Sequence, residues 1–186
     1  MRLRRLLSLL LLALSVSTSA VAAGVGAETW VLVDIEARRM DVYRNGDAIH
    51  RFRNIAIGSG GAAPVRLAGQ KQTPLGEFRI NRINRNSQFH IFLGLDYPSM
   101  SHAERALAAG LIDHDTYKSY LDGYARLGRP PQDTPLGGYI GIHGIGKGDP
   151  RIHRLFDWTN GCIALTNEQV EKLASLVRVG TRVFIR

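Results

Sequence analysis

Apolar and polar positions alternate along much of the first half of the chain. Residues 28–58 contain three short alternating runs, and Asn45-Gly46 stands between two of them as a tight hairpin turn. The stretches GEFRINRI (76–83) and FHIFLGL (89–95) have the character of two further strands. The sequence therefore predicts that the chain opens as an antiparallel sheet.

Helical spacing replaces this alternation in the middle of the chain. Ser101 and Glu104 fit a capping box that starts a short helix, which ends at Gly110. Over residues 113–128, apolar side chains recur at helical spacing. We therefore expect a helical insertion within residues 97–138 that interrupts the sheet.

The last third of the chain returns to strands around one more helix. YIGIHG (139–144) predicts a buried strand, and TRVFIR (181–186) predicts a final one. Between them, Thr166 and Gln169 form a second capping box ahead of an amphipathic helix. The predicted fold class is mostly β with α insertions, a β-sandwich or barrel with a helix after Cys162.

The N-terminus has the three-part layout of a secretory signal peptide. Arginines precede a leucine-rich run and then small residues, which predicts a signal over residues 1–23 with cleavage after Ala20, Ala22 or Ala23. The apolar run is too short to span a bilayer comfortably, and no second one of about 18 residues follows. We expect a periplasmic or otherwise exported protein without stable membrane insertion, with one domain over residues 28–186.

The charge balance changes this picture little. The formal charge of +8 becomes +5 without the three signal arginines, because 21 basic groups then face 16 acidic ones. This excess suits an acidic polymer such as cell wall, although solubility alone explains it equally well. Nucleic acid is excluded as a partner, since the basic residues are scattered and the protein is exported.

Cys162 is the only cysteine in the sequence. One interpretation is a small buried hydrophobic residue. An exported protein meets oxidants, however, so an unpaired thiol there is well hidden, paired between molecules or used chemically. Gly161 precedes it, and a sharp turn there would let backbone amides converge as an oxyanion hole.

A nucleophilic thiol needs a base, and six histidines are available. Three occupy charged or polar stretches and are expected at the surface: His50, His102 and His114. His90 is compatible with either environment. His143 differs, because it ends an apolar strand and is followed by Gly144, which is well placed to enter a cleft.

His153 is the competing histidine. It lies in the charge-rich segment DPRIHRLFDW, which predicts a mobile loop over the site. It could also join His143 and Cys162 as a zinc ligand, but the spacing is not that of a structural zinc site and no fourth ligand is evident. We expect neither a metal nor an organic cofactor.

These motifs together resemble the L,D-transpeptidase catalytic domain of bacterial cell-wall enzymes. The segment IHG (142–144) is followed, 18 residues after its histidine, by the Gly-Cys of TNGCIALTN. QKQTPLGEFRI is similar to the Thr-Pro-x-Gly-x-Phe turn of that family, and the opening strands match as well. The resemblance covers nearly the whole chain after the signal and implies an L,D-transpeptidase-like fold.

The resemblance implies a role for each matching residue. Cys162 would be the nucleophile, His143 the proton acceptor and donor, and the carbonyl of Gly144 the group that orients the imidazole. Thr159 stands where the family usually has serine. The amides near Gly161 and Cys162 would stabilise the oxyanion.

Two positions depart from the family pattern. Asn160 stands where the family often has histidine, and Ala164 stands where an arginine commonly follows the cysteine. The departures change the expected substrate contacts and leave the nucleophile and the base intact.

The implied activity is acyl transfer on peptidoglycan tetrapeptide stems. Cys162 would attack the carbonyl at the L-to-D junction and expel the terminal D-alanine. The acceptor would be the amine of another stem peptide in 3-3 cross-linking, of a wall-linked lipoprotein or of a free D-amino acid, and carbapenem-type inhibitors are expected to react. The alternatives are a carboxypeptidase or amidase that hydrolyses wall peptide or lipoprotein linkages, and a noncatalytic wall-binding module.

Overall fold

The structure is a computed structural model that describes residues 28–186, so the signal peptide expected over residues 1–23 lies outside the described residues. Eight strands form one mixed sheet in the order β3-β2-β1-β10-β6-β7-β8-β9, and β4 pairs with β5. The strands are β1 (Thr29–Asp34), β2 (Arg39–Arg44), β3 (Asp47–Arg53), β4 (Ala62–Ala63), β5 (Thr73–Pro74), β6 (Gly76–Ser87), β7 (His90–Leu95), β8 (Gly141–His143), β9 (Ile163–Ala164) and β10 (Arg182–Ile185). The expectation of a mostly β fold with helical insertions is confirmed.

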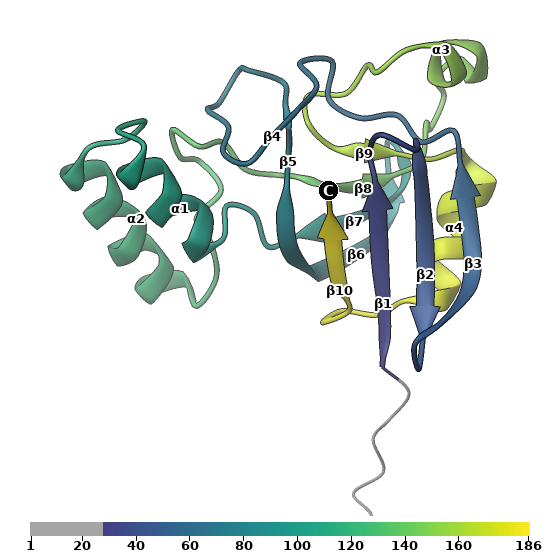
Figure 1. Cartoon of the computed structure of the whole chain (residues 1–186), viewed down its shortest axis with the longest axis horizontal. Helices are drawn as coiled ribbons and strands as arrows, with labels where there is room; N and C mark the ends of the chain where they lie inside the picture. The colour runs from purple at the N-terminus through teal and green to yellow at the C-terminus, as the bar shows by residue number, and fades with distance from the viewer. Residues whose placement is uncertain (1–27) are drawn as a thin grey trace, which may run out of the picture.

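Strand β6 joins the two halves of this sheet. Its first residues pair with β10, and its residues from Ile80 onward pair with β7. In Figure 1, β1, β2, β3 and β10 run side by side while β7 and β8 cross behind them. The sheet therefore bends along β6, and the inner faces of its two halves enclose the core.

The predicted hairpin turn is present between β2 and β3. Asn45 and Gly46 have φ angles of +54° and +91°, so both central residues are left-handed. Two such residues make a turn whose twist matches that of the flanking strands, and asparagine followed by glycine tolerates it best.

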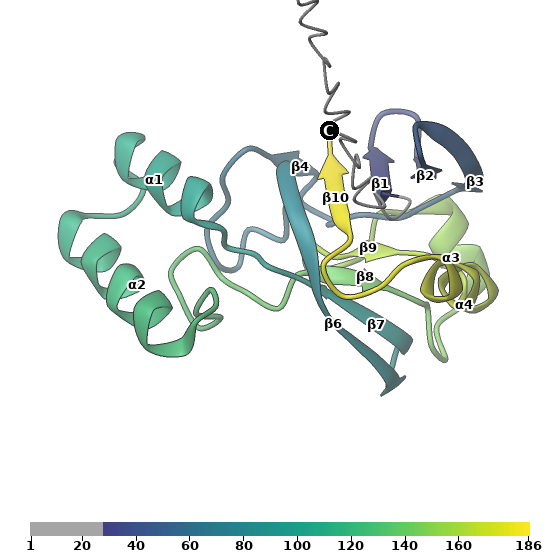
Figure 2. The same ribbon diagram turned by 90° about the horizontal axis from the view of Figure 1, so that it is seen from below.

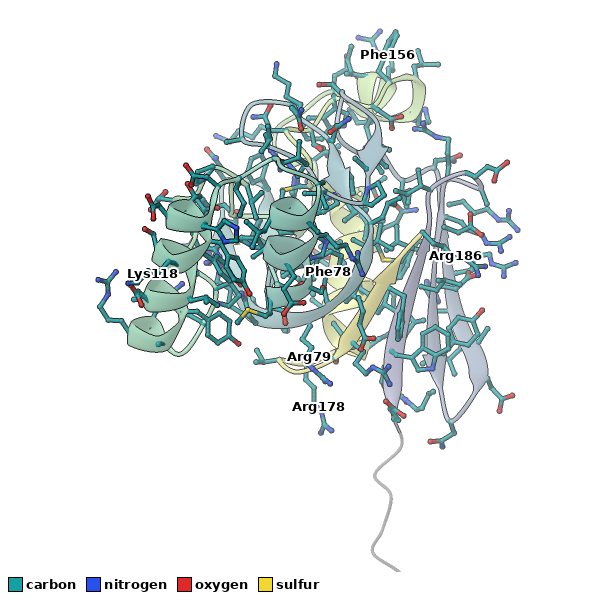
Figure 3. The ribbon with its side chains drawn as sticks, turned by 60° about the vertical axis from the view of Figure 1, so that its left-hand side comes forward. Phe78, Arg79, Lys118, Phe156, Arg178 and Arg186 are labelled. Carbon is teal, nitrogen blue, oxygen red and sulfur yellow. The ribbon has the colours of Figure 1, made fainter. Side chains whose placement is uncertain are left out.

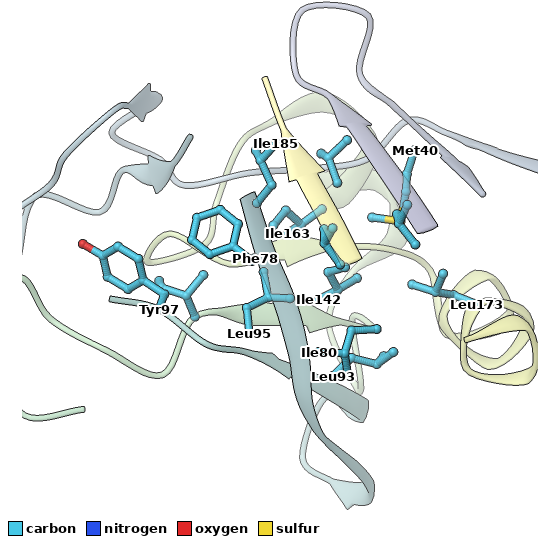
Figure 4. Close-up of a cluster of buried hydrophobic side chains, with 14 of the residues drawn as sticks. Met40, Phe78, Ile80, Leu93, Leu95, Tyr97, Ile142, Ile163, Leu173 and Ile185 are labelled. Atoms are coloured by element: carbon cyan, nitrogen blue, oxygen red, sulfur yellow. The ribbon is translucent and has the colours of Figure 1, made fainter. Parts of the chain in front are cut away.

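The core lies where the bent sheet meets the last helix. Figure 4 shows Phe78 and Ile80 of β6 beside Leu93 of β7 and Ile142 of β8. All four are at most 1% exposed. Leu173, fully buried as well, reaches this cluster from the helix that follows the cysteine. The strand that ends in His143 is thus anchored by its apolar neighbours.

Four helices complete the described chain: α1 (Met100–Ala108), α2 (His114–Leu127), α3 (Pro150–Leu155) and α4 (Asn167–Leu176). The pair α1 and α2 packs together and lies to one side of the sheet, whereas α4 packs on β7 and β8 (Figure 2). Asp113 caps α2, and Gly128 ends it in the left-handed conformation. The capping box of Thr166 and Gln169 is present at α4. Within residues 28–186, no helix has the length and apolar character that crossing a membrane requires.

The expected capping box at Ser101 and Glu104 is wrong. The residue that precedes α1 is Ser99, and its hydroxyl lies 2.6 Å from Nδ1 of His102 instead of capping a backbone amide. The hydroxyl of Ser99 contacts the ring of His102 rather than a backbone amide, because a buried ring nitrogen needs a partner more than a helix end near solvent does.

The expectation that His102 lies at the surface is also wrong. The side chain is fully buried, and its Nε2 lies 3.0 Å from the carbonyl oxygen of Leu75. It stacks on Phe78, with 5.1 Å between ring centroids. The polar sequence around His102 concealed this, since its neighbours on the other side of α1 face solvent.

Candidate active site

The register of two short parallel strands brings Cys162 and His143 together. Ile142 of β8 pairs with Ile163 of β9, so Cys162, one residue earlier, lies beside Gly141. Residues two apart on a strand share a face of the sheet, and so do direct neighbours on adjacent strands. Cys162 and His143 therefore project from the same face.

Both side chains line one cleft, whose volume is about 960 Å³. Its walls come from loop residues 66–69 and 137–140, from strands β6 to β8 and from residues 158–162. A cleft of this size has room for a peptide. The predicted pair thus lies on one accessible surface.

His143 is buried, with 2% of its surface exposed, and one of its ring nitrogens is hydrogen-bonded. Its Nδ1 lies 2.7 Å from the carbonyl oxygen of Gly144. A carbonyl only accepts, so Nδ1 carries the proton in the neutral ring and Nε2 is left as a proton acceptor. This is the contact that the family resemblance implies for Gly144.

Aromatic rings surround the imidazole. Phe89 stacks on it with 4.3 Å between centroids, and the indole of Trp158 meets it edge-on at 5.8 Å. Burial among these rings lowers the pKa of His143, the hydrogen bond to Gly144 opposes part of this shift, and His153 adds to it. The imidazole of His143 is therefore neutral at physiological pH.

Gly144 is required by close packing as well as by its carbonyl. A Cβ built on it would lie 2.6 Å from Oδ1 of Asn167 and 2.7 Å from the carbonyl oxygen of Phe89. Asn167 in turn accepts from the amide of Gly146 at 2.9 Å and donates to the Gly146 carbonyl at 2.8 Å. The first residue of α4 thereby holds the turn that orients His143.

Cys162 is half-buried and rests as a thiol. Burial raises its pKa to about 11, while the Gly141 backbone and the charges of Arg66 and Arg82 oppose the shift. Its Sγ lies 3.6 Å from the carbonyl oxygen of Tyr139, to which it donates weakly. With this pKa the thiol is largely protonated at neutral pH.

Thr159 braces the turn that carries the cysteine. Its buried hydroxyl donates to the carbonyl of Cys162 at 2.7 Å and accepts from the amide of Gly161 at 3.1 Å. The Gly161 amide is thus already engaged, which leaves the amide of Cys162 as the candidate oxyanion donor. Thr159 therefore holds the geometry of the turn.

Gly161 permits a close approach of two groups to this turn. Its φ is +122°, and a Cβ there would lie 2.6 Å from the carbonyl oxygen of Gln72 and 2.7 Å from Nη1 of Arg66. Any larger residue would collide with both, so the glycine is needed for the arginine to lie beside the cysteine.

Asp157 anchors the start of the same segment, a role that sequence reasoning missed. Its carboxylate accepts from the amide of Ile57 at 3.0 Å and pairs with Arg38 at 3.1 Å. The only available signal was its position at the head of DWTNGC. The pairing ties the cysteine turn to the loop after β3.

The structure corrects the expectation of a mobile loop at His153. The residue belongs to α3 and is 1% exposed. Its Nδ1 lies 3.5 Å from Nε1 of Trp158, and its Nε2 is buried without a partner. No three His, Cys, Asp or Glu side chains in the described part of the chain gather into a metal site, so the zinc alternative gains no support.

Two arginines of the cleft were also missed. Arg66 comes from the loop before β5, and Arg82 lies on β6, with its guanidinium 5.2 Å from the centroid of Phe92. Neither Asp nor Glu lines the cleft. The cleft around the cysteine therefore carries positive charge.

A second hollow, of about 580 Å³, shares no lining residue with the cleft of Cys162 and His143. It is lined by Arg44, Arg79, Arg178 and Arg182 together with Glu28, and no cysteine or histidine lines it. Figure 3 shows Arg79 and Arg178 projecting together near the end where the described chain begins. Without a nucleophile or base, it is not a candidate active site.

Comparison with known protein families identifies the family of this chain. Residues 28–185 match the model of the L,D-transpeptidase catalytic domain, YkuD. The chain belongs to this family. The match spans both elements of the candidate site, the strand of His143 and the turn of Cys162. Among curated proteins, no sequence matches this chain significantly.

Solved structures share the fold of this L,D-transpeptidase family member. A variant of the helical cell shape determining protein Pgp2 from Campylobacter jejuni is 20% identical, with a TM-score of 0.59 over 86% of this chain and 47% of its own. Bdellovibrio bacteriovorus Bd1075 is 17% identical, with a TM-score of 0.56 over 86% of this chain and 48% of its own. The Ldtfm-avibactam carbamoyl enzyme is 15% identical, with a TM-score of 0.51 over 86% and 49%. The chain spans about half the length of these structures.

Proposed function

We propose that this chain is a cysteine-dependent enzyme that transfers acyl groups on the peptide stems of peptidoglycan. The observation that carries the proposal is that Cys162 and His143 project from one sheet face into one cleft, with the imidazole held by Gly144. Membership in the L,D-transpeptidase family supports the substrate class. An exported, periplasmic location is part of the same proposal.

The chemistry has two balanced halves. In the first, the Sγ–carbon bond forms as the thiol proton of Cys162 moves to Nε2 of His143; the carbon–nitrogen bond then breaks and the proton passes to the leaving amine. In the second, an amine attacks the thioester, gives its proton to His143, and the sulfur leaves and recovers that proton. The amide of Cys162 faces the developing oxyanion.

Hydrolysis is the second candidate, because one observation favours it. An acceptor amine is largely a cation at neutral pH, and a cleft with Arg66, Arg82 and no carboxylate repels cations. Water in place of the amine would release the acyl group, which makes the protein a carboxypeptidase or amidase on wall peptide or lipoprotein linkages. The acylation half is common to both candidates.

The products of tetrapeptide-bearing wall fragments test the proposal. Incubation of the fragments with purified protein should give cross-linked dimers if an amine is the acceptor, or shortened monomers if water is. Unchanged fragments would contradict both candidates and favour a noncatalytic wall-binding module.

Covalent labelling checks the nucleophile independently. A carbapenem should add its mass to the wild-type protein and nothing to Cys162→Ala, since the acyl group has nowhere else to form a thioester. Equal labelling of both proteins, or labelling of neither, would argue against Cys162 as the nucleophile.

A further inference from the structure

The helical insertion holds one wall of the cleft in place. The hydroxyl of Tyr97 donates to the carbonyl of Leu136 at 2.9 Å and reaches that of Arg66 at 3.4 Å. The amide of Ala68 donates to the carbonyl of Pro135 at 2.8 Å. Both ends of the insertion are therefore hydrogen-bonded to the loop that carries Arg66. The insertion thus fixes the position of Arg66 in the wall of the cleft.

The side chain of Arg66 is buried beside the cysteine turn without an anion. Only 5% of the residue is exposed, and its Nε is buried with no hydrogen-bond partner. None of the ion pairs within residues 28–186 includes it. Its two terminal nitrogens lie against Gly161 and Gly137, where a Cβ would stand 2.7 and 3.5 Å away.

A buried cation without a counter-ion is costly and points to a missing ligand. Guanidinium is the side-chain group that best matches a carboxylate, because its planar fork donates two parallel hydrogen bonds. Arg82 adds a second positive charge to the same cleft, and no acidic side chain there competes for either one. The ligand that fits is an anion bound within reach of the sulfur.

We propose that Arg66 binds a free carboxylate of the substrate, carried by the residue adjoining the carbonyl that Cys162 attacks. The inference rests on the proposed function, in which the tetrapeptide stem ends one residue beyond the scissile amide, and it assigns the recognition of that free end to Arg66. An amidated or extended peptide would leave the guanidinium unpaired. The insertion thus contributes to specificity by holding Arg66 in place.

Alkylation of Cys162 tests this site without any wall peptide. Iodoacetate carries a carboxylate and iodoacetamide is its neutral counterpart, so the ratio of their rates at pH 9 reports anion binding and cancels changes in thiol ionisation. We expect Arg66→Gln to lower the iodoacetate-to-iodoacetamide ratio about tenfold. Arg66→Lys should recover only part of the ratio, because a point charge lacks the fork. Lys118→Gln, which removes a charge from exposed α2, is the matched control and should keep the wild-type ratio.

A second arm uses substrates that differ at one group. Wild-type protein should process a tetrapeptide with a C-terminal carboxylate about 100-fold faster, in kcat/KM, than its carboxamide, since the carboxamide leaves a buried donor unpaired. Arg66→Gln should process the two almost equally. If the variants do not fold, protection of wild-type Cys162 from iodoacetamide by N-acetyl-D-alanine, and not by its amide, replaces them.

The two arms separate the possible failures. An unchanged alkylation ratio in Arg66→Gln, or equal protection by the acid and the amide, would overturn the role of Arg66 even if the protein turns over wall peptides. A lowered ratio together with no turnover would support the anion site and reject the proposed function.

Discussion

Two buried histidines, His143 and His102, differ in one respect that matters. Both are at most 2% exposed, both stack on phenylalanine, and burial lowers the pKa of both. The ring of His102 has a partner at each nitrogen, Ser99 and Leu75, whereas His143 has one at Nδ1 only. Burial alone therefore does not mark a candidate base. The unfilled nitrogen beside a cleft does.

The largest expected effect is the difference in activity between variants of His143 and of His102. Replacing His143 with glutamine removes the imidazole that we propose takes the thiol proton, and we expect kcat/KM on tetrapeptide fragments to fall about 10³-fold or more. His102→Gln should change activity per folded molecule by less than about twofold, since the ring touches no part of the cleft. A comparable loss in both variants would mean that His143 acts through the fold.

For the free energy of unfolding, we expect a large effect from replacing His102. His102→Ala opens a cavity and leaves the carbonyl of Leu75 without its donor, so we expect the free energy of unfolding to fall by about 2–4 kcal/mol. Urea unfolding followed by circular dichroism measures this. The exposed His114→Ala is the control and should stay within about 0.5 kcal/mol of wild type. A loss that small in His102→Ala would mean that the ring is replaceable by water.

His143 and His102 share a lowered pKa, which should make the stability of the protein fall in acid. A lowered folded-state pKa means that the unfolded chain binds the proton first, so stability is full above about pH 6.5 and falls as the pH drops below it. Each histidine contributes a slope of up to about 1.4 kcal/mol per pH unit. Urea unfolding at pH 7.5, 6.5 and 5.5 should give a flatter dependence for His102→Gln and for His143→Gln than for wild type. Unchanged slopes would contradict the assigned burial.

Activity should follow His143 alone in the same pH range. We propose its neutral form as the base, so kcat/KM should hold from pH 8 down to 6.5 and decline only below it. Alkylation of Cys162 by iodoacetamide should instead rise from pH 7 to 10, because a thiol with a pKa of about 11 is still ionising there. An alkylation rate that is already flat at pH 7 would mean a resting thiolate.

The sequence was sufficient to predict local features whose cause is local. The Asn45-Gly46 turn, the helix within residues 113–128 and the capping box at Thr166 depend on residues a few positions apart, and all were confirmed. His143 and Cys162 were predicted from short motifs, and the structure places them on one cleft, although their catalytic roles remain a prediction.

The errors concern contacts between distant segments. His102 lies in a polar stretch and Arg66 lies among small apolar residues, and only tertiary partners from Leu75 and Tyr97 show that both are buried. α3 was taken as a loop because six residues carry too little periodicity to detect. Alternation reports one element at a time, so it cannot show which polar residue another element covers.

His153 is an intermediate case and offers the smallest effect. It is buried like the other two, it accepts from Trp158, and its Nε2 has no partner. His153→Phe removes an unpaired buried polar atom, so stability should hold or rise by about 1 kcal/mol. Activity should fall only about two- to fivefold, because Trp158 keeps its packing on His143 and loses one weak hydrogen bond. A loss near that of His143→Gln would instead place His153 in the path of the proton. An unpartnered ring nitrogen would then be enough to mark a histidine that takes part in the reaction.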